Sequence, residues 1–254
     1  LRVYPTRASQ AVIDRALSVR GGRAELLQAY IDVEPASYNR GFYSVDIRYY
    51  SRITAEAFLA ASENASAYAA DYAFLESAGE NSLEGFLFPK TYAVTEDMDA
   101  EAVVRMMLDQ FQKETASLDW SYPQSQGLSI YDAVNLASIV EKESSGDEQI
   151  RAKVAAVFYN RLETTGEPSY GFLQSDATTA YEVGHDPTPE EVHAETPYST
   201  YTNKGLPPTP ICSPSLEALK ATLEPTDSDD LYFYITQDEE YFSQTYEEHQ
   251  QSWN

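Results

Sequence analysis

One glutamate in the run Leu136–Ser144 has the position that acid catalysis requires. An apolar helical pattern follows Ser129, a good N-cap, and at about 100° per residue it places Glu143 within about 20° of Leu136. Glu143 is therefore predicted to lie on the buried stripe in the last turn, whereas Glu141 is predicted to face solvent. Apolar surroundings and the negative end of the helix dipole both disfavour a carboxylate, so we expect a raised pKa. A carboxyl that stays protonated near neutral pH can act as a general acid.

The helix alone leaves a structural role for Glu143 open. A glutamate at the edge of an apolar face commonly reaches solvent or pairs with a base, and Lys142 or Arg151 could serve as that base. Perturbed carboxyls mark functional sites only statistically, because structural ion pairs also shift pKa values.

Composition excludes several classes of partner and cofactor. The 254 residues include 41 acidic and 17 basic ones, a net charge of −24, which argues against a nucleic acid or an anionic membrane surface as partner. Cys212 is the only cysteine, so neither an internal disulfide nor a cysteine zinc site is expected. The three histidines form no metal-binding pattern, and no glycine-rich phosphate loop is present. We therefore expect no metal and no cofactor.

The hydrophobic patterns along the sequence predict an α+β protein of two parts, whose elements must position Glu143. Residues 1–52 are predicted to form a small α+β unit, and residues 53–254 a larger, helix-rich domain. In the small unit, strands are expected at 1–4 and 42–49, and helices at 9–18 and 24–31.

The larger domain has helical patterns that begin after good N-caps. These helices are predicted at 55–62 (with helical character continuing to Ala78), 99–115, 130–143, 147–162 and 215–223. A β-hairpin is predicted from strands at 231–236 and 241–244. Residues 83–92 are expected to be a structured loop, 119–127 a linker, and the proline-rich stretch 165–214 irregular.

Seven segments in order resemble one family. They are Leu-Glu-Gly-Phe-Leu-Phe-Pro-Lys-Thr-Tyr (83–92), Leu-Ala-Ser-Ile-Val-Glu-Lys-Glu (136–143), Val-Phe-Tyr-Asn-Arg-Leu (157–162), Leu-Gln-Ser-Asp-Ala-Thr (173–178), Pro-Tyr-Ser-Thr-Tyr (197–201), Gly-Leu-Pro-Pro-Thr-Pro-Ile (205–211) and Leu-Tyr-Phe (231–233), the last followed by Glu248-His249. Their order and spacing resemble the endolytic murein transglycosylases, the YceG-like family of bacterial cell-wall enzymes. The resemblance is strong over 83–254, whereas the first fifty residues resemble only the small LysM-like unit that precedes the catalytic domain.

The resemblance implies a lyase that cuts nascent peptidoglycan glycan strands internally. The bond cut joins N-acetylmuramic acid to N-acetylglucosamine, and the muramic acid C6 hydroxyl attacks its own C1 to leave a 1,6-anhydro end. The family's glutamate matches Glu143, the second glutamate of the Glu-Lys-Glu run. Hydrolases usually need two carboxyls, but with an internal nucleophile one carboxyl can act first as acid and then as base.

The resemblance also implies a location and partners. Family members are anchored in the cytoplasmic membrane by one N-terminal helix, and the remainder lies outside the cytoplasm. We expect this chain to be such an extracytoplasmic portion without the anchoring helix. The expected partners are glycan strands of peptidoglycan and the synthases that make them.

A polar trio is predicted to bind the sugar near the catalytic helix. Gln174, Ser175 and Asp176 match a family motif, and their side chains could hydrogen-bond sugar hydroxyls or N-acetyl groups. The alternative is that they form a turn in which Asp176 is a cap.

A second motif contributes further predicted sugar contacts. Tyr198 and Tyr201 could stack on sugar rings, although packing is a comparable alternative in a chain with 20 tyrosines. Ser199 stands where the family has asparagine, which removes an amide from the predicted sugar site. The other departures from the family pattern are Lys90, Ala177 and Thr209.

Two other functions remain as alternatives. A non-catalytic glycan-binding scaffold of the cell-wall synthesis machinery is consistent with the change at Ser199, but not with the intact Glu143. A pyridoxal-phosphate lyase, a label this family has sometimes carried, would need a Schiff-base lysine beside a phosphate cup, and none of the lysines lies beside a glycine-rich cradle.

Overall fold

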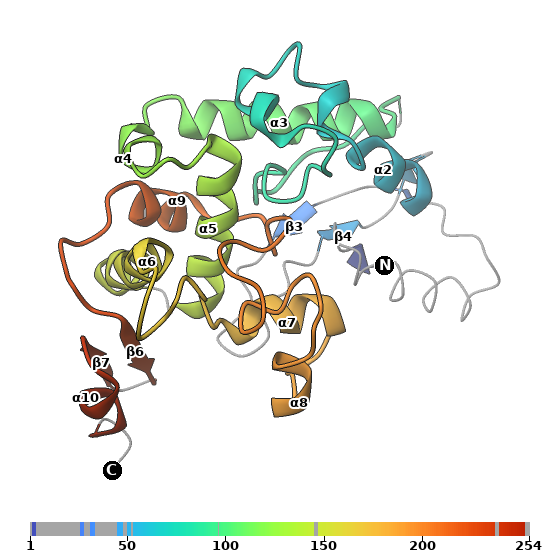
Figure 1. The fold of residues 1–254 in the computed structure, drawn as a ribbon. Helices are drawn as coiled ribbons and strands as arrows, with labels where there is room; N and C mark the ends of the chain where they lie inside the picture. Colours follow the sequence, from blue (N-terminus) through green and yellow to red (C-terminus); the bar gives the residue numbers. More distant parts are fainter. Residues whose placement is uncertain are drawn as a thin grey trace. The chain divides into compact units, whose positions relative to one another are not determined.

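The structure is a computed structural model. It describes residues 53–251 apart from 96, 145–146 and 237–238, together with five short strand segments before residue 52. The chain divides into two compact units, the first comprising Leu1–Ser117 with Ile211–Ser213 and the second comprising Leu118–Pro210 with Pro214–Asn254 (Figure 1).

Short antiparallel strands account for the described part of the chain before residue 52. They are β1 (Arg2–Val3), β2 (Leu26–Leu27), β3 (Ile31–Val33), β4 (Val45–Ile47) and β5 (Tyr50–Ser51). β4 lies between β1 and β3, and β2 pairs with β5. β1 and β4 confirm the strands predicted at 1–4 and 42–49, but the predicted helix at 24–31 is wrong where β2 and β3 occupy it. The predicted helix at 9–18 lies outside the described residues, and the LysM-like character of 1–52 stays a prediction.

The rest of the first unit is helical. It contains α2 (Ala55–Ser62), two 3₁₀ helices, η1 (Ala65–Ala67) and η2 (Ala73–Ala78), and α3 (Ala100–Thr115). The predicted caps are confirmed, because the side chain of Thr54 accepts a hydrogen bond from the Ala57 N–H and that of Asp99 accepts one from the Ala102 N–H. The alanine-rich stretch does not continue as an α-helix. The Asn64 side chain instead accepts a hydrogen bond from the Ser66 N–H, a local contact that competes with helical pairing.

The loop at 83–92 packs into the core of this unit, as predicted. Phe86 is fully buried, and its ring centroid lies 5.2 Å from that of Phe111 on α3. The ring centroid of Phe74 lies 4.8 Å from that of Phe111, and the Phe74 ring stacks on that of Phe86. This aromatic cluster holds the loop against the helix without regular secondary structure in the loop itself.

Three packed helices form the core of the second unit. They are α5 (Ile130–Glu143), α6 (Glu148–Glu163) and α9 (Leu216–Leu223), and α4 (Ser121–Ser125) lies against α5 and α9. α5 is buried on nearly all sides from Tyr131 to Val140, which is typical of a helix enclosed by its neighbours. Ser129 and Asp132 close a capping box at its start, and Asp147 and Ser215 cap α6 and α9. The sequence predicted these three helices to within one or two residues.

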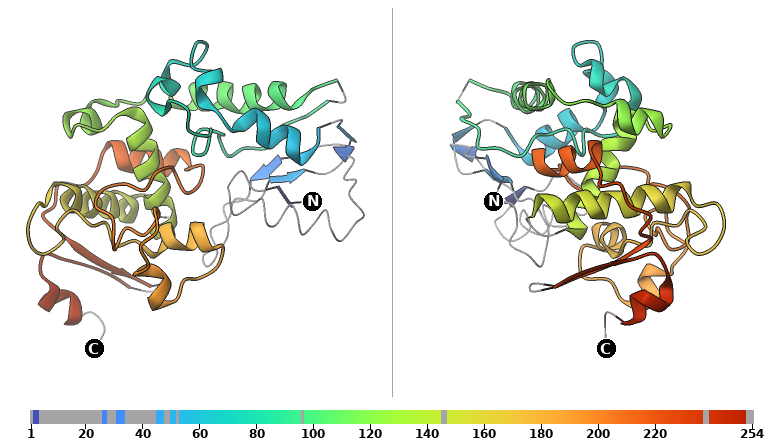
Figure 2. Two further views of the ribbon diagram at one scale, coloured as in Figure 1. Left: turned by 45° about the vertical axis from the view of Figure 1, so that its right-hand side comes forward. Right: turned by 90° about the vertical axis from the view of Figure 1, so that its left-hand side faces the viewer.

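The remaining elements of the second unit are short. They are α7 (Asp176–Val183), α8 (Pro189–Val192), β6 (Tyr232–Ile235), β7 (Glu240–Ser243) and α10 (Tyr246–Gln251). β6 and β7 form the predicted C-terminal hairpin, with Phe233 opposite Phe242, and α10 lies beside it in both views of Figure 2. The ring of Phe233 packs edge-on against Phe158, so the hairpin is joined to α6.

Three short helices correct the predicted irregular segments. α4 lies in the predicted linker, and α7 and α8 lie in the stretch predicted to be irregular. α8 begins with a Thr188–Glu191 capping box and a proline at its first position, and α7 ends at Gly184 in the left-handed conformation. These helices have only four to eight residues, too few for a hydrophobic period to stand out in the sequence.

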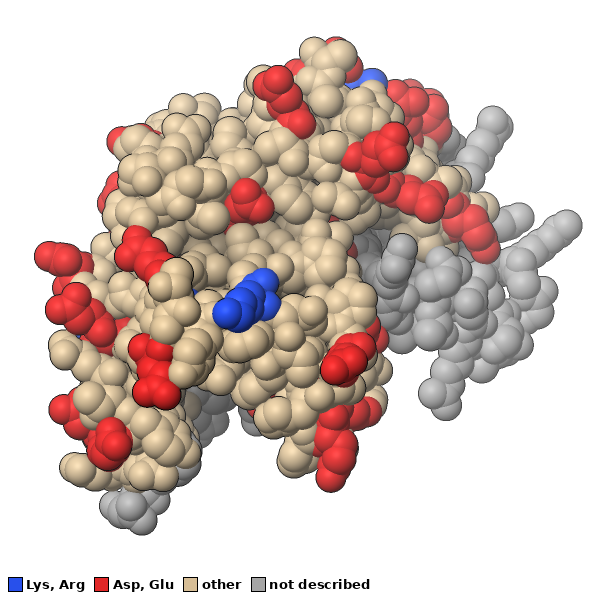
Figure 3. Space-filling model, in the orientation of Figure 1, with Lys and Arg blue, Asp and Glu red and all other residues tan. Residues whose placement is uncertain are grey.

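The surface is acidic. Acidic side chains are spread over the visible face in Figure 3, with few basic ones among the described residues there. Within the described part of the chain, no helix is both long and apolar enough to cross a membrane.

Candidate active site

Glu143 is the last residue of α5, and its carboxyl group faces the start of α7. The side chain keeps some exposed surface, yet protein atoms surround it densely. The buried part of α5 beneath it holds the helix end in place. The carboxyl group is thus desolvated, although the residue as a whole keeps some exposed surface.

Ser175 is the direct partner of Glu143. Its hydroxyl donates a 2.5 Å hydrogen bond to Oε1 of Glu143, and the residue is 2% exposed. The Ser175 N–H donates to Oγ1 of Thr200 at 2.9 Å, and the Ser175 carbonyl accepts from Oγ1 of Thr178 at 2.8 Å. These contacts hold the serine backbone on both sides, so the hydroxyl has a fixed direction.

The pKa of Glu143 is raised, in the direction that the sequence predicted. Burial is the largest cause, and the negative charge of Asp176 acts in the same direction. The hydrogen bond from Ser175, a hydrogen bond from the backbone of Ala177 and the charge of Arg161 each lower the pKa without reversing the shift. The protonated form of the carboxyl group is therefore favoured, although neighbouring hydrogen-bond donors would stabilise the ionised form.

Arg161 supplies a buried positive charge in this region. It is 7% exposed, its Nε donates to the Leu231 carbonyl at 2.7 Å, and its Nη1 donates to the Leu173 carbonyl. The guanidinium carbon lies 5.8 Å from the ring centroid of Tyr232. Its described hydrogen bonds go to backbone carbonyls and not to a carboxylate. It acts on Glu143 through its charge and joins the segment before Ser175 to the start of the hairpin.

Asp176 and Tyr201 are paired at the edge of the site. The Tyr201 hydroxyl donates a 2.7 Å hydrogen bond to Oδ1 of Asp176, whose side chain is exposed. Burial is the main cause that raises the pKa of Tyr201, so the phenol stays protonated and remains a donor. The His193 ring lies 5.1 Å from that of Tyr201. Asp176 therefore places an open carboxylate beside Glu143.

Gln174 has an unusual backbone conformation. Its φ is 54°, in the left-handed region that residues with a Cβ seldom adopt, and its N–H donates to the Thr200 carbonyl at 3.1 Å. This conformation leaves Gln174 exposed between the buried Leu173 and Ser175. Strained residues of this kind concentrate at functional sites, and the Gln174 side chain is free to meet a ligand.

Tyr198 is half-buried, and Ser199 is buried. The Tyr198 ring lies 5.1 Å from the Tyr181 ring, and its hydroxyl is 2.7 Å from Oγ1 of Thr209. Ser199 is fully buried, and its hydroxyl donates to the Val192 carbonyl at the end of α8. In this arrangement Ser199 offers no polar atom to a ligand, so the expected contact with a sugar gains no support.

Glu141 was predicted to face solvent, and this prediction is wrong. Its side chain is 8% exposed, and Oε2 accepts hydrogen bonds from the N–H and the hydroxyl of Ser215 at 3.2 and 2.5 Å. Arg151 lies 3.8 Å from its Oε1. The packing of α9 on this side of α5 covers the face that a single-helix projection assigns to water. Arg151 therefore contacts Glu141, the other glutamate of the Glu-Lys-Glu run.

The sequence did not identify Thr200, whose contacts with Ser175 help to fix the site. It lies within the motif at 197–201, and that motif is the only signal that could have pointed to it. The motif at 205–211 likewise contacts α5, because Asn135 Nδ2 donates to the Pro207 carbonyl at 2.7 Å. Among the described residues, no cluster of three or more His, Cys, Asp or Glu side chains could hold a metal ion.

Comparison with known proteins gives the chain a family. The model of the YceG-like family matches residues 24–254. A protein of Streptococcus pneumoniae named endolytic murein transglycosylase is 34% identical over 217 residues, which cover 78% of this chain and 38% of that protein. A protein of the same name from Bacillus subtilis is 33% identical over 175 residues, which cover 66% of this chain and 46% of that protein.

A solved structure agrees with this match. The crystal structure of a YceG-like protein from Listeria monocytogenes superposes with a TM-score of 0.67 at 29% identity, covering 78% of this chain and 67% of that chain. The chain spans less than half the length of the curated relatives that it matches. With the family match extending over most of its residues, the chain belongs to the YceG-like family.

Proposed function

We propose that this chain is the catalytic portion of an endolytic murein transglycosylase. The relatives named above carry that activity in their names, and the observation that carries the proposal here is the setting of Glu143. Its carboxyl group has a raised pKa and accepts a hydrogen bond from the buried hydroxyl of Ser175, and the residue as a whole keeps some exposed surface. The substrate would be a peptidoglycan glycan strand, cut between N-acetylmuramic acid and N-acetylglucosamine.

The proposed reaction uses Glu143 twice. In the first step the protonated carboxyl gives its proton to the glycosidic oxygen as the bond from C1 breaks. In the second step the carboxylate takes a proton from the C6 hydroxyl of the same muramic acid as that oxygen bonds to C1. Because the nucleophile belongs to the substrate, its orientation replaces a second catalytic carboxyl. The product is a 1,6-anhydro end, and no cofactor is needed.

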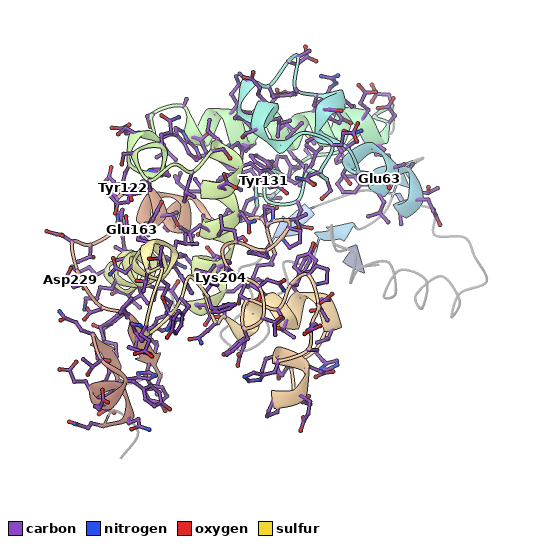
Figure 4. The ribbon with its side chains drawn as sticks, in the orientation of Figure 1. Glu63, Tyr122, Tyr131, Glu163, Lys204 and Asp229 are labelled. Carbon is purple, nitrogen blue, oxygen red and sulfur yellow. The ribbon has the colours of Figure 1, made fainter. Side chains whose placement is uncertain are left out.

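Mass spectrometry of purified glycan strands tests this proposal. The wild type is expected to release internal fragments with 1,6-anhydro ends, and Glu143→Gln is expected to release none, because an amide cannot give a proton to the leaving oxygen. Glu163→Gln makes the same chemical change at the exposed last residue of α6, labelled in Figure 4, and should retain activity.

Two other outcomes would point elsewhere. Reducing ends in place of anhydro ends would indicate a hydrolase and would require a second carboxyl, for which Asp176 is a candidate because its charge acts on Glu143. Strand binding without cleavage by any variant would favour the glycan-binding scaffold.

We also propose that this portion works on the outer side of the cytoplasmic membrane, held there by a single N-terminal helix of the native protein, beside the synthases that make murein. This proposal is supported by the substrate, because murein lies outside the cytoplasm. Exposure of the native protein to added protease in intact spheroplasts is the expected result, and protection would contradict it.

A further inference from the structure

The start of α7 is capped in an unusual way. Ser175 occupies the N-cap position, where a serine side chain normally accepts a hydrogen bond from an N–H of the first turn. Here the Ser175 side chain makes no such bond and donates to Oε1 of Glu143. The backbone of Ala177, in that first turn, also lowers the pKa of Glu143. The Glu143 carboxyl group therefore takes the place of the missing cap.

The two donors converge on one carboxyl group. A hydroxyl and an N–H at a helix N-terminus both favour a negative charge, and the helix dipole adds to this preference. Burial acts in the opposite direction and favours the neutral acid. Such an arrangement suits a carboxyl that begins protonated and becomes ionised midway through a reaction, because the donors point at the charge as it develops.

Ser175 itself is placed to act through Glu143 rather than on a ligand. It is 2% exposed, and its backbone is held by Thr200 and Thr178, whose hydroxyl oxygens lie 3.2 Å apart. Since Oε1 of Glu143 accepts the serine hydroxyl, Oε2 is the oxygen left to carry the proton.

We propose that Ser175 is a positioning residue that stabilises the ionised Glu143 carboxylate through Oε1 and leaves Oε2 to carry the proton exchanged with the sugar. This proposal rests on the acid–base role proposed above. The proton leaves Oε2 for the glycosidic oxygen as the C1–O bond breaks, and a proton from the C6 hydroxyl returns to Oε2 as the new C1–O6 bond forms. Ser175 itself neither gains nor loses a proton overall.

Kinetics of three serine variants test the proposal. Ser175→Ala is expected to lower kcat by about 100-fold with little change in KM, as loss of one donor to a developing charge does elsewhere. The pH above which kcat falls should also rise, because loss of a donor to the carboxylate raises the pKa of Glu143. Ser175→Thr keeps the hydroxyl and should restore most of the rate. Ser169→Ala removes another buried serine hydroxyl, one that donates to a backbone carbonyl, and should leave kcat and the pH profile unchanged.

A titration without substrate separates this proposal from the proposed function. In protein labelled with ¹³C at glutamate carboxyls, the Glu143 signal is identified by its loss in Glu143→Gln. Its titration midpoint is expected to be higher in Ser175→Ala than in the wild type and in Ser169→Ala. If the midpoint shifts in Ser175→Ala but the wild-type protein cleaves no glycan, the proposed enzymatic function is refuted. The effect of the Ser175 hydrogen bond on the Glu143 carboxyl group would still be supported.

Two results would overturn the proposal. One is an unchanged midpoint in a folded Ser175→Ala protein. The other is a rise in KM with kcat and the pH profile unchanged, which would make Ser175 the sugar contact that the family resemblance suggested.

Discussion

Replacing Arg161 by methionine removes the buried charge that joins the active-site segment to the hairpin. The guanidinium group donates hydrogen bonds to the carbonyls of Leu173 and Leu231, and it is 7% exposed. Its carbon lies 5.8 to 6.0 Å from three ring centroids, those of Tyr232, Phe233 and Phe158. Methionine keeps an unbranched apolar side chain but can donate to neither carbonyl.

The expected loss of stability follows from these contacts. Each buried carbonyl left without its donor costs about 1–3 kcal/mol, and loss of the cation–π contacts adds about 0.5–1 kcal/mol. Removal of a desolvated charge offsets part of this cost. A net destabilisation of about 3 kcal/mol is expected, which at about 2–4 °C per kcal/mol lowers the melting temperature by roughly 6–12 °C for a chain of this size.

Thermal and urea unfolding followed by circular dichroism measure this effect. Arg105→Met is the matched control, because Arg105 is 36% exposed and pairs with Asp71 and Glu101 at the surface of the first unit. An exposed ion pair contributes up to about 1 kcal/mol and an i,i+4 helix pair about 0.3–0.5 kcal/mol, so loss of the two pairs should lower the melting temperature by less than about 6 °C. Equal losses in the two variants, or a loss below about 1 kcal/mol for Arg161→Met, would refute the reasoning.

Two further predictions concern α5. Folded Glu143 binds its proton more tightly than the unfolded chain does, so its contribution to stability is present below the unfolded pKa and is lost as the pH rises through the folded pKa. Glu143→Gln should therefore unfold at higher urea than the wild type at neutral pH, with the difference vanishing below about pH 4; a difference independent of pH would contradict the shift. Ser129→Ala removes the capping box of α5 and should lower the free energy of unfolding by about 1 kcal/mol, measured by urea unfolding; an unchanged midpoint would show that packing alone holds the helix start.

The sequence by itself determined the helices that carry or surround the site. Their starts are marked by side chains that bond the helix within the next three residues, and their buried faces follow the helical period. The caps confirmed in this way are Thr54, Asp99, Ser129 and Ser215. Asp147, predicted only as the first residue of its helix, caps α6. The same local logic placed Glu143 toward protein at the end of α5 and gave the direction of its pKa shift.

The sequence pattern failed where a structure depends on distant residues. The segment 24–31 has a helical pattern, but β2 pairs with β5 and β3 with β4, and pairing partners later in the chain are invisible to a local period. Glu141 projects to the solvent side of an isolated helix, yet α9 covers that side. Short helices such as α8 depend on their capping boxes more than on any hydrophobic repeat.

Only the tertiary structure decided what surrounds Glu143. Ser175 is 32 positions away in the chain, and Arg161 reaches a carbonyl 70 positions away. Family motifs contained these residues but gave Ser175 only an expected contact with the sugar and gave Arg161 no partner. Hydrogen-bond direction and burial are properties of packed atoms, so the choice between a serine that contacts substrate and one that holds the acid is made by packing and not by the local sequence.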